Sequence, residues 1–428
     1  MKIYKDLFKT SALSGLGTLL KILTSLLSLK IVALYTGPAG VGIFGQFMAF
    51  VNVIAIIAGG GITLGVIKYV AEYSAKPELG EFLASSTCFT LIFSILTLIL
   101  GLTFSTILAK WILGTEEYSY LFQLLAIAQF FIALHLLFCA IINGFEKIKK
   151  LLAINIGTSL VSMGLIIYCS IVYQTKGTLL GYILAQVASL LVSFLYVYRE
   201  SWFPLLFSMK PRMKDLVSLS HYSLMNIISA LTVPIAQVIV RNDLRYVFGW
   251  EAVGYWQAVV RISDAYILFV TTALTAYYLP RLSKQNSVHN LKTEIGLGLK
   301  GLMPLFGFIL FVLYVFRSQI ITLLYDNSFQ PVQELFFYQL LGDFFRVGGW
   351  LFTYFLLAKS WTKTYIITEA ILALLFIVIS HFFVRVYGLI GVTYSFALTY
   401  FLYALMMTGI GLYYFKGSER KWRIVNIP

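Results

Sequence analysis

The sequence of 428 residues is 60% hydrophobic and 12% charged, with a mean hydropathy of +0.87. A soluble protein of this length carries about 25% charged residues, so the composition excludes a water-soluble globule and predicts that lipid surrounds much of the chain. The net charge of +14 is spread over short breaks between apolar runs, a distribution that argues against nucleic-acid binding.

Apolar segments long enough to cross a bilayer follow one another along the whole sequence. We expect an all-α membrane protein of about 12 transmembrane helices, arranged as two six-helix parallel-repeat lobes around a central cavity. The predicted spans are 11–36, 41–67, 84–109, 118–144, 151–173, 178–198, 216–240, 252–279, 295–316, 331–358, 364–384 and 387–415.

The lysine and arginine residues predict the orientation of these spans. The N-terminus, every second break and the C-terminal tail carry 21 of them, whereas the opposite breaks carry 6. Because positive residues accumulate on the cytoplasmic side of a membrane, both termini are predicted to lie in the cytoplasm.

The longest break divides the sequence near its middle and contains Pro204 and Pro211. We therefore predict an N-terminal six-helix lobe at 1–199, a cytoplasmic linker at 200–215, and a C-terminal six-helix lobe with a basic tail at 216–428.

The two halves have matching residues at nearly constant offsets, which favours an internal duplication. At an offset of 212 the matches are Gly37, Val41, Gly42, Phe44 and Asn52 with Gly249, Val253, Gly254, Trp256 and Asp264. At an offset of 214, Gln129 matches Asp343 and Asn155 matches Glu369. Because each half has an even number of spans, the two halves are predicted to share one orientation.

Positive charges within the spans are candidate substrate-binding groups, because an ionisable side chain in a membrane usually faces a cavity or a partner. Of the five positive residues within the spans, the candidates are Lys21, Lys30, Arg261 and Arg346; Lys300 is the fifth. Lys21 and Lys30 are nine residues apart, on opposite faces of a straight helix, so one of them is expected to be structural.

Acidic residues within the spans lie mainly in the second half. Asp264 is three residues from Arg261 and Asp343 is three residues from Arg346, so each pair is within ion-pair reach on one helix face. The pairs either lock helices together or combine an anion-binding arginine with an acid that tunes it or binds a coupling cation. Glu369 is either a site for H⁺ or Na⁺ or an interfacial residue paired with Lys359 or Lys363.

No catalytic constellation, metal-ligand cluster or ATP-binding motif is visible, so we predict no enzyme activity, no metal and no cofactor, with H⁺ or Na⁺ coupling left open. Gly59, Gly60 and Gly61 are interpreted as a site of close packing or a gating bend.

Three stretches resemble the Wzx-type flippases for O-antigen repeat units and lipid III, which belong to the multidrug/oligosaccharidyl-lipid/polysaccharide exporter superfamily. They are Thr36-Gly37-Pro38-Ala39-Gly40-Val41-Gly42 with Ile67-Lys68-Tyr69-Val70-Ala71-Glu72-Tyr73, Val253-Gly254-Tyr255-Trp256-Gln257 with Ile262-Ser263-Asp264, and Leu340-Leu341-Gly342-Asp343. The resemblance implies a transporter that moves an undecaprenyl-pyrophosphate-linked oligosaccharide from the cytoplasmic to the periplasmic leaflet by alternating access, with membrane lipid, a polysaccharide polymerase and a chain-length regulator as partners.

Within this family, several charged positions resemble the lipid III branch: Lys30, Lys68, Arg241, Asp264, Asp343 and Glu369. Arg261 departs from that branch, and Arg346 stands where it has lysine. These two departures favour an O-antigen repeat unit as substrate, with lipid III of the enterobacterial common antigen as the alternative. An ion-coupled drug antiporter of the same superfamily is a further alternative, disfavoured because cations are prominent within the spans.

Overall fold

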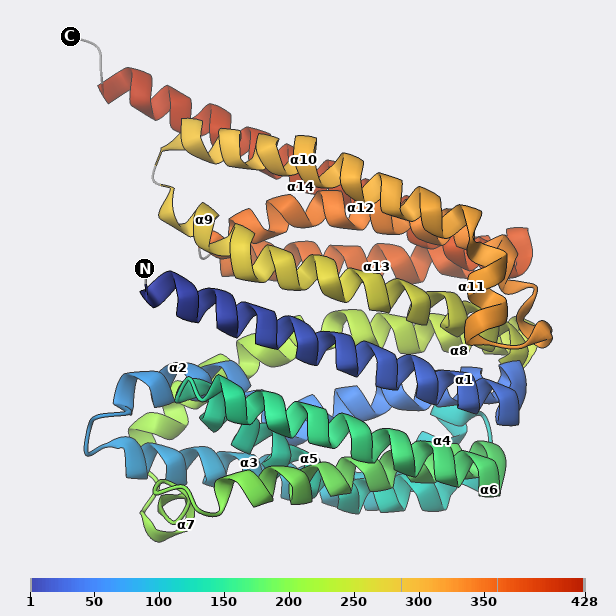
Figure 1. Ribbon diagram of the computed structural model, residues 1–428, viewed down its shortest axis with the longest axis horizontal. Helices are drawn as coiled ribbons and strands as arrows, with labels where there is room; N and C mark the ends of the chain where they lie inside the picture. The colour runs from blue at the N-terminus through green and yellow to red at the C-terminus, as the bar shows by residue number, and fades with distance from the viewer. Residues whose placement is uncertain (1, 286, 360, 426–428) are drawn as a thin grey trace. The chain divides into compact units, whose positions relative to one another are not determined.

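The computed structural model describes residues 2–285, 287–359 and 361–425, and every regular element in these ranges is helical (Figure 1). The elements of the first half are α1 (Lys2–Ala58), α2 (Thr63–Tyr73), α3 (Leu79–Thr103), α4 (Ser105–Leu113), η1 (Glu116–Tyr118), α5 (Ser119–Gly144), α6 (Ile148–Val197) and α7 (Leu205–Ser208). Those of the second half are α8 (Met213–Ala273), η2 (Leu274–Tyr278), α9 (Leu279–Lys284), α10 (Val288–Val315), α11 (Arg317–Leu324), η3 (Asn327–Phe329), α12 (Val332–Ala358), α13 (Thr362–Tyr387), η4 (Gly388–Ile390) and α14 (Gly391–Val425).

Eight helical segments in the described residues are long and apolar enough to cross a membrane. Four of them are interrupted at one residue with positive φ: Gly37, Gln174, Gly249 and Gly388. Dividing each of the four there gives twelve segments, which is consistent with the twelve predicted spans. The prediction of an all-α membrane protein is confirmed.

The interruptions repeat along the chain at the offsets found in the sequence. Gly37 (φ 63°, ψ −172°) and Gly249 (φ 80°, ψ −177°) are 212 residues apart and have almost the same backbone conformation. Gln174 and Gly388, 214 residues apart, also form an equivalent pair, with φ values of 51° and 70°. Each half therefore changes direction at corresponding positions, as an internal duplication predicts.

The turns at Gln174 and Gly388 share a close backbone approach. A Cβ atom on Gly177 would lie 1.9 Å from the carbonyl oxygen of Cys169, and a Cβ on Gly391 would lie 2.1 Å from that of Phe383. These two glycines are 214 residues apart, and so are the two residues that they meet. Only glycine fits where a neighbouring backbone comes this close.

The three glycines at 59–61 form a break, as the sequence suggested. α1 ends at Ala58 and α2 begins at Thr63, and Gly60 and Gly61 between them have φ values of 68° and 63°. The predicted span 41–67 is therefore two helices. Positive φ is unfavourable for residues with a side chain, which explains why glycines occupy the break.

The chain divides into two compact units, residues 1–238 and 239–428, and the division lies inside α8. The first part of α8 belongs to the first unit because Leu219 is fully buried in that unit's core, together with Val66 and Val70 of α2. The predicted linker 200–215 contains α7, and its residue Trp202 is buried in the same core. The predicted lobes at 1–199 and 216–428 describe the sequence repeat, and their boundaries stay a prediction.

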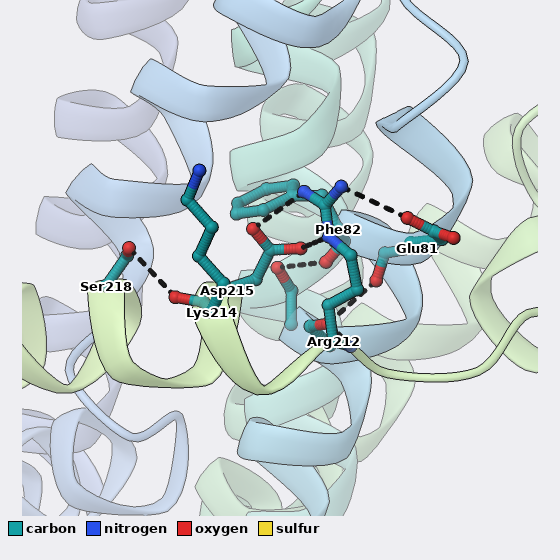
Figure 2. A network of polar contacts seen from close by, with 8 residues as sticks. Glu81, Phe82, Arg212, Lys214, Asp215 and Ser218 are labelled. Atoms are coloured by element: carbon teal, nitrogen blue, oxygen red, sulfur yellow. Dashed lines mark hydrogen bonds and ion pairs between the residues drawn. The ribbon is translucent and has the colours of Figure 1, made fainter.

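A network of charged side chains fastens the beginning of α8 to the beginning of α3 (Figure 2). The Arg212 guanidinium lies 3.1 Å from Glu81 of α3 and 2.9 Å from Asp215, and the backbone N–H of Arg212 donates to the Ser85 hydroxyl at 2.8 Å. The hydrogen bond to Asp215 raises the pKa of Arg212. The network is one structural reason why this part of α8 belongs to the first unit.

A second charged cluster joins the start of α6 to Glu200, three residues beyond the end of that helix. Glu200 has an 8% exposed side chain and accepts hydrogen bonds from Lys147 and Lys150. Burial raises the pKa of Glu200, but the two ammonium groups outweigh burial and the pKa is lowered overall.

We expect Glu200→Gln to reduce the free energy of unfolding at neutral pH and to make that free energy less dependent on pH in the acid range. A carboxyl with a lowered folded-state pKa stabilises the fold above its ordinary pKa, and this contribution is lost as the pH falls through the lowered value. The loss at pH 7 should be about 1 kcal/mol, since both lysines are partly exposed. Thermal melting of the purified protein between pH 7 and pH 3 measures it; equal melting curves for both proteins would contradict the assignment.

Candidate functional site

A buried polar cluster lies within the second unit, centred on Asp343 of α12. The Asp343 side chain is fully buried, and its Oδ2 accepts hydrogen bonds from the hydroxyls of Ser263 and Tyr266, both on α8. Burying a carboxylate without partners is very unfavourable, so these two donors help to explain how an acid is accommodated here.

Arg346, one turn further along α12, supplies the opposite charge. Its guanidinium lies 3.6 Å from Asp343 Oδ1, and its central carbon lies 4.6 Å from the ring centre of Trp350 and 5.4 Å from that of Tyr400. Cations are attracted to the faces of aromatic rings, most strongly where water is excluded. The predicted i,i+3 pair is therefore formed, with aromatic rings enclosing the arginine.

The cluster continues through α14 to Glu369 of α13. The Tyr403 hydroxyl donates to Glu369 Oε1 at 2.8 Å and lies 2.9 Å from the hydroxyl of Thr353. Glu369 is buried, and Lys359 donates to the carbonyl of Gln285 at 2.6 Å. The hydrogen-bond partner of Glu369 is therefore Tyr403. Lys359 binds the Gln285 carbonyl instead of Glu369, the partner that the interfacial alternative gave it.

The second predicted pair, on α8, is formed in a more open environment. Arg261 lies 3.5 Å from Asp264, and their side chains are 25% and 49% exposed. Arg241, also on α8, is buried, donates from Nε to Gln257 Oε1 at 3.1 Å and lies over the ring of Trp256.

The remaining predicted cations lie on α1 in the first unit. Lys21 is exposed between the exposed residues Leu20 and Leu23, and Lys30 is half-buried. The four predicted cations are thus divided between the two units. The structure joins Arg346 to Asp343 and Arg261 to Asp264, and aromatic rings connect Arg346 to Glu369.

The first half has a neutral counterpart of Asp343 at the equivalent position. Gln129 of α5 is fully buried, and its amide donates to the carbonyl of Ser94 at 2.7 Å. An amide does not titrate near neutral pH, so only the second half has a buried acid at this position. Ion coupling through a buried carboxyl at this repeated position would accordingly be a property of the second unit.

Sequence reasoning missed the side chains that complete the cluster. They are Ser263, Tyr266, Trp350, Thr353, Tyr400 and Tyr403. The sequence has 28 tyrosines and 35 phenylalanines, so no single aromatic residue is distinctive. The one signal available in the sequence is a spacing of three or four residues from Asp343 or Arg346, which places two side chains on the same helix face. Of these six residues, only Trp350 has that spacing.

Chemically, the cluster can hold or exchange a proton or a small cation at a buried carboxyl. Among the described residues, no three His, Cys, Asp or Glu side chains gather in a way that would hold a metal ion. The fold and these intramembrane charges define a multi-pass membrane transporter.

The chain belongs to the family described as "Polysaccharide biosynthesis protein", whose model matches residues 7–286. The resemblance to Wzx-type flippases of the multidrug/oligosaccharidyl-lipid/polysaccharide exporter superfamily is thereby confirmed, and the chain is a transporter rather than an enzyme.

Two relatives match the chain over nearly its whole length. The lipid III flippase of Escherichia coli strain K12 is 30% identical over 414 residues, covering 95% of this chain and 98% of the relative. A Shigella flexneri protein provisionally described as an O-antigen transporter is 25% identical over 420 residues, covering 94% and 97%.

Two solved structures share the fold. An inward-facing multidrug-resistance transporter of the MATE family has a TM-score of 0.78 at 16% identity and covers 94% of this chain and 96% of that one. The lipid II flippase MurJ, in an inward closed conformation, has a TM-score of 0.74 at 17% identity, with coverage of 94% and 86%.

Proposed function

We propose that the protein flips an undecaprenyl-pyrophosphate-linked oligosaccharide from the cytoplasmic to the periplasmic leaflet of a bacterial inner membrane, with both termini in the cytoplasm. The observation that carries the proposal is the 30% identity with a lipid III flippase over 95% of the chain. The positive residues on alternate breaks support the orientation.

The substrate that we favour from the sequence is an O-antigen repeat unit, because Arg261 and Arg346 depart from the lipid III branch. A second candidate substrate is lipid III itself, which the higher of the two identities favours. Both substrates have the same anionic pyrophosphate and prenyl chain, so the two proposals share one mechanism.

In this mechanism the head group crosses within the protein while the prenyl chain stays in lipid. A pyrophosphate and its sugars cannot cross about 30 Å of hydrocarbon unshielded. We propose that Lys21, Lys30, Arg261 and Arg346 contact the anionic head group as the two lobes open to each side in turn. Asp264, Asp343 and Glu369 tune these cations or bind H⁺ or Na⁺.

Partner proteins follow from the same proposal. The flipped product is consumed on the periplasmic side, so a polysaccharide polymerase and a chain-length regulator are the expected partners. No resident cofactor is required by this mechanism.

Complementation in two strains tests the function and separates the two substrates. We expect the wild-type protein to restore surface polysaccharide in cells that lack their own O-antigen flippase. In cells that lack the lipid III flippase, it should restore enterobacterial common antigen to a smaller extent. Immunoblotting of the two polysaccharides measures both results. Equal or greater rescue in the second strain would reverse the substrate assignment, and no rescue in either strain would contradict the proposed function.

The proposed cationic contacts have their own test in the same strains. We expect Lys21→Ala and Arg261→Ala each to reduce rescue about tenfold or more, since each removes a charge-assisted contact. Membrane abundance of each variant provides the control. Full rescue by both variants would remove these residues from the binding site.

A further inference from the structure

Lys68 of α2 differs from several cations of the first unit in what surrounds its charge. Lys76 lies 3.7 Å from Glu72, Arg212 contacts Glu81 and Asp215, and Lys147 and Lys150 contact Glu200. Among the described residues, by contrast, Lys68 forms no ion pair within 4.0 Å. An exposed lysine with no carboxylate in contact is available to an anion from outside the protein.

Aromatic rings hold this lysine in place. Its ammonium donates to the Tyr222 hydroxyl at 2.7 Å and lies 5.1 Å from the ring centre of Tyr69 and 5.3 Å from that of Tyr222. The two rings meet edge to face at 5.8 Å. An ammonium group has three donors, and the tyrosine hydroxyl uses one of them. The hydrogen bond to Tyr222 raises the pKa of Lys68, which is therefore charged at neutral pH.

The protein backbone positions both partners. Gly65 of α2 packs directly on Tyr222, because a Cβ there would lie 3.2 Å from the Tyr222 side chain. One turn along α8, the Asn226 amide donates to the carbonyl of Gly61 at 2.8 Å. Val66 and Val70 anchor the other face of α2 in the core. The lysine and the rings thus stand on a fixed support, which reduces the entropic cost of binding.

The location fits a substrate that arrives from the cytoplasm. Tyr69 contacts Tyr73 and Phe82, and Phe82 is adjacent to Glu81 of the Arg212 network (Figure 2). This end of the first unit contains breaks that are rich in lysine and arginine, so it is the predicted cytoplasmic end. Half-buried aromatic rings beside an exposed cation suit a head group that combines sugar rings with phosphates, since the apolar face of a sugar packs on an aromatic ring.

We propose that Lys68, Tyr69 and Tyr222 form a first binding subsite for the pyrophosphate of the lipid-linked saccharide, at the cytoplasmic end of the first unit. The inference rests on the proposed function and adds a position that the predicted intramembrane cations do not include. A bulk anionic phospholipid carries the same phosphate chemistry, so the experiment must separate the two sources.

Equilibrium binding of radiolabelled undecaprenyl pyrophosphate to the purified full-length protein, in phosphatidylcholine nanodiscs, tests the subsite. Lys68→Gln keeps the side-chain length and a hydrogen-bond donor but removes the charge. We expect it to weaken binding about tenfold, as the loss of one charge-assisted contact does, and to leave undecaprenol binding unchanged. Lys68→Arg should retain most of the affinity, and phosphatidylglycerol should compete poorly.

Lys76→Ala is the matched control, since Lys76 is three residues beyond α2 and paired with Glu72. It should bind undecaprenyl pyrophosphate as the wild type does. Wild-type affinity in Lys68→Gln, an equal loss in Lys76→Ala, or competition by phosphatidylglycerol at equal concentration would each overturn the subsite. If wild type fails both to bind undecaprenyl pyrophosphate and to complement either strain, the proposed function is wrong; complementation with unaltered binding by Lys68→Gln refutes the subsite alone.

Discussion

Replacing Asp343 with Asn is expected to destabilise the protein by roughly 3–5 kcal/mol and to abolish transport. The substitution removes the carboxylate partner of Arg346, whose side chain is only 19% exposed, and removing one partner of a largely buried ion pair leaves an uncompensated charge. Thermal melting of the purified variant measures the first effect. Restoration of surface polysaccharide, corrected for the amount of protein in the membrane, measures the second.

The exposed pair on α8 provides a matched control for this prediction. Asp264 is also three residues from an arginine, but its side chain is 49% exposed, so Asp264→Asn should cost less than about 1 kcal/mol. The double variant Asp343→Asn with Arg346→Met should recover part of the lost stability, because both charges of the pair are then removed. If Asp343→Asn and Asp264→Asn melted at similar temperatures, burial of the Asp343 ion pair would not contribute to stability as predicted.

Gly177→Ala and Gly391→Ala are expected to be the most damaging alanine substitutions at the turns of the two halves. Each added methyl group would lie about 2 Å from a backbone carbonyl oxygen, at Cys169 and Phe383 respectively. A backbone atom cannot rotate away as a side chain can, so the helices on both sides must separate. We expect a loss of at least 1–3 kcal/mol, the ordinary range for overpacking, seen as reduced melting temperature and membrane yield.

Gly164→Ala and Gly409→Ala are suitable controls, because a Cβ at either position meets no other atom within 4 Å. Both residues lie within helices, where alanine is favoured over glycine by about 1 kcal/mol. These variants should therefore melt at or above the wild-type temperature. A tolerated methyl group at Gly177 but not at Gly391 would show that the two turns are not equivalent.

Much of the fold was predictable because the membrane restricts what a chain can do. Long apolar runs identified the helices, and the offset of 212 between Gly37 and Gly249 predicted a repeat whose reversals coincide in the structure. The two charged pairs were also predictable, since residues three apart on a helix share a face whatever surrounds them. By contrast, the segment 41–67 was predicted as one helix, because hydropathy does not register the positive φ of Gly60 and Gly61.

The surroundings of the charges were not predictable. Tyr266 and Tyr400 are 77 and 57 residues away from Asp343 along the chain, and nothing in an aromatic-rich sequence distinguishes them from tyrosines that face lipid. The place where the compact units divide was also hidden, because it depends on the packing of α8 on α2 and α3 rather than on composition. The roles of the predicted cations and acids stay predictions.

The buried pair of α12 has a consequence for how the protein is made. This helix is the least apolar of the eight candidate spans, and it carries Asp343 and Arg346 into hydrocarbon. Its donors Ser263 and Tyr266 are translated earlier, whereas Tyr400 emerges from the ribosome only after α13. α12 should therefore leave the insertion machinery together with α8, because a chain that has been synthesised only as far as the end of α12 already contains both hydroxyl donors to Asp343.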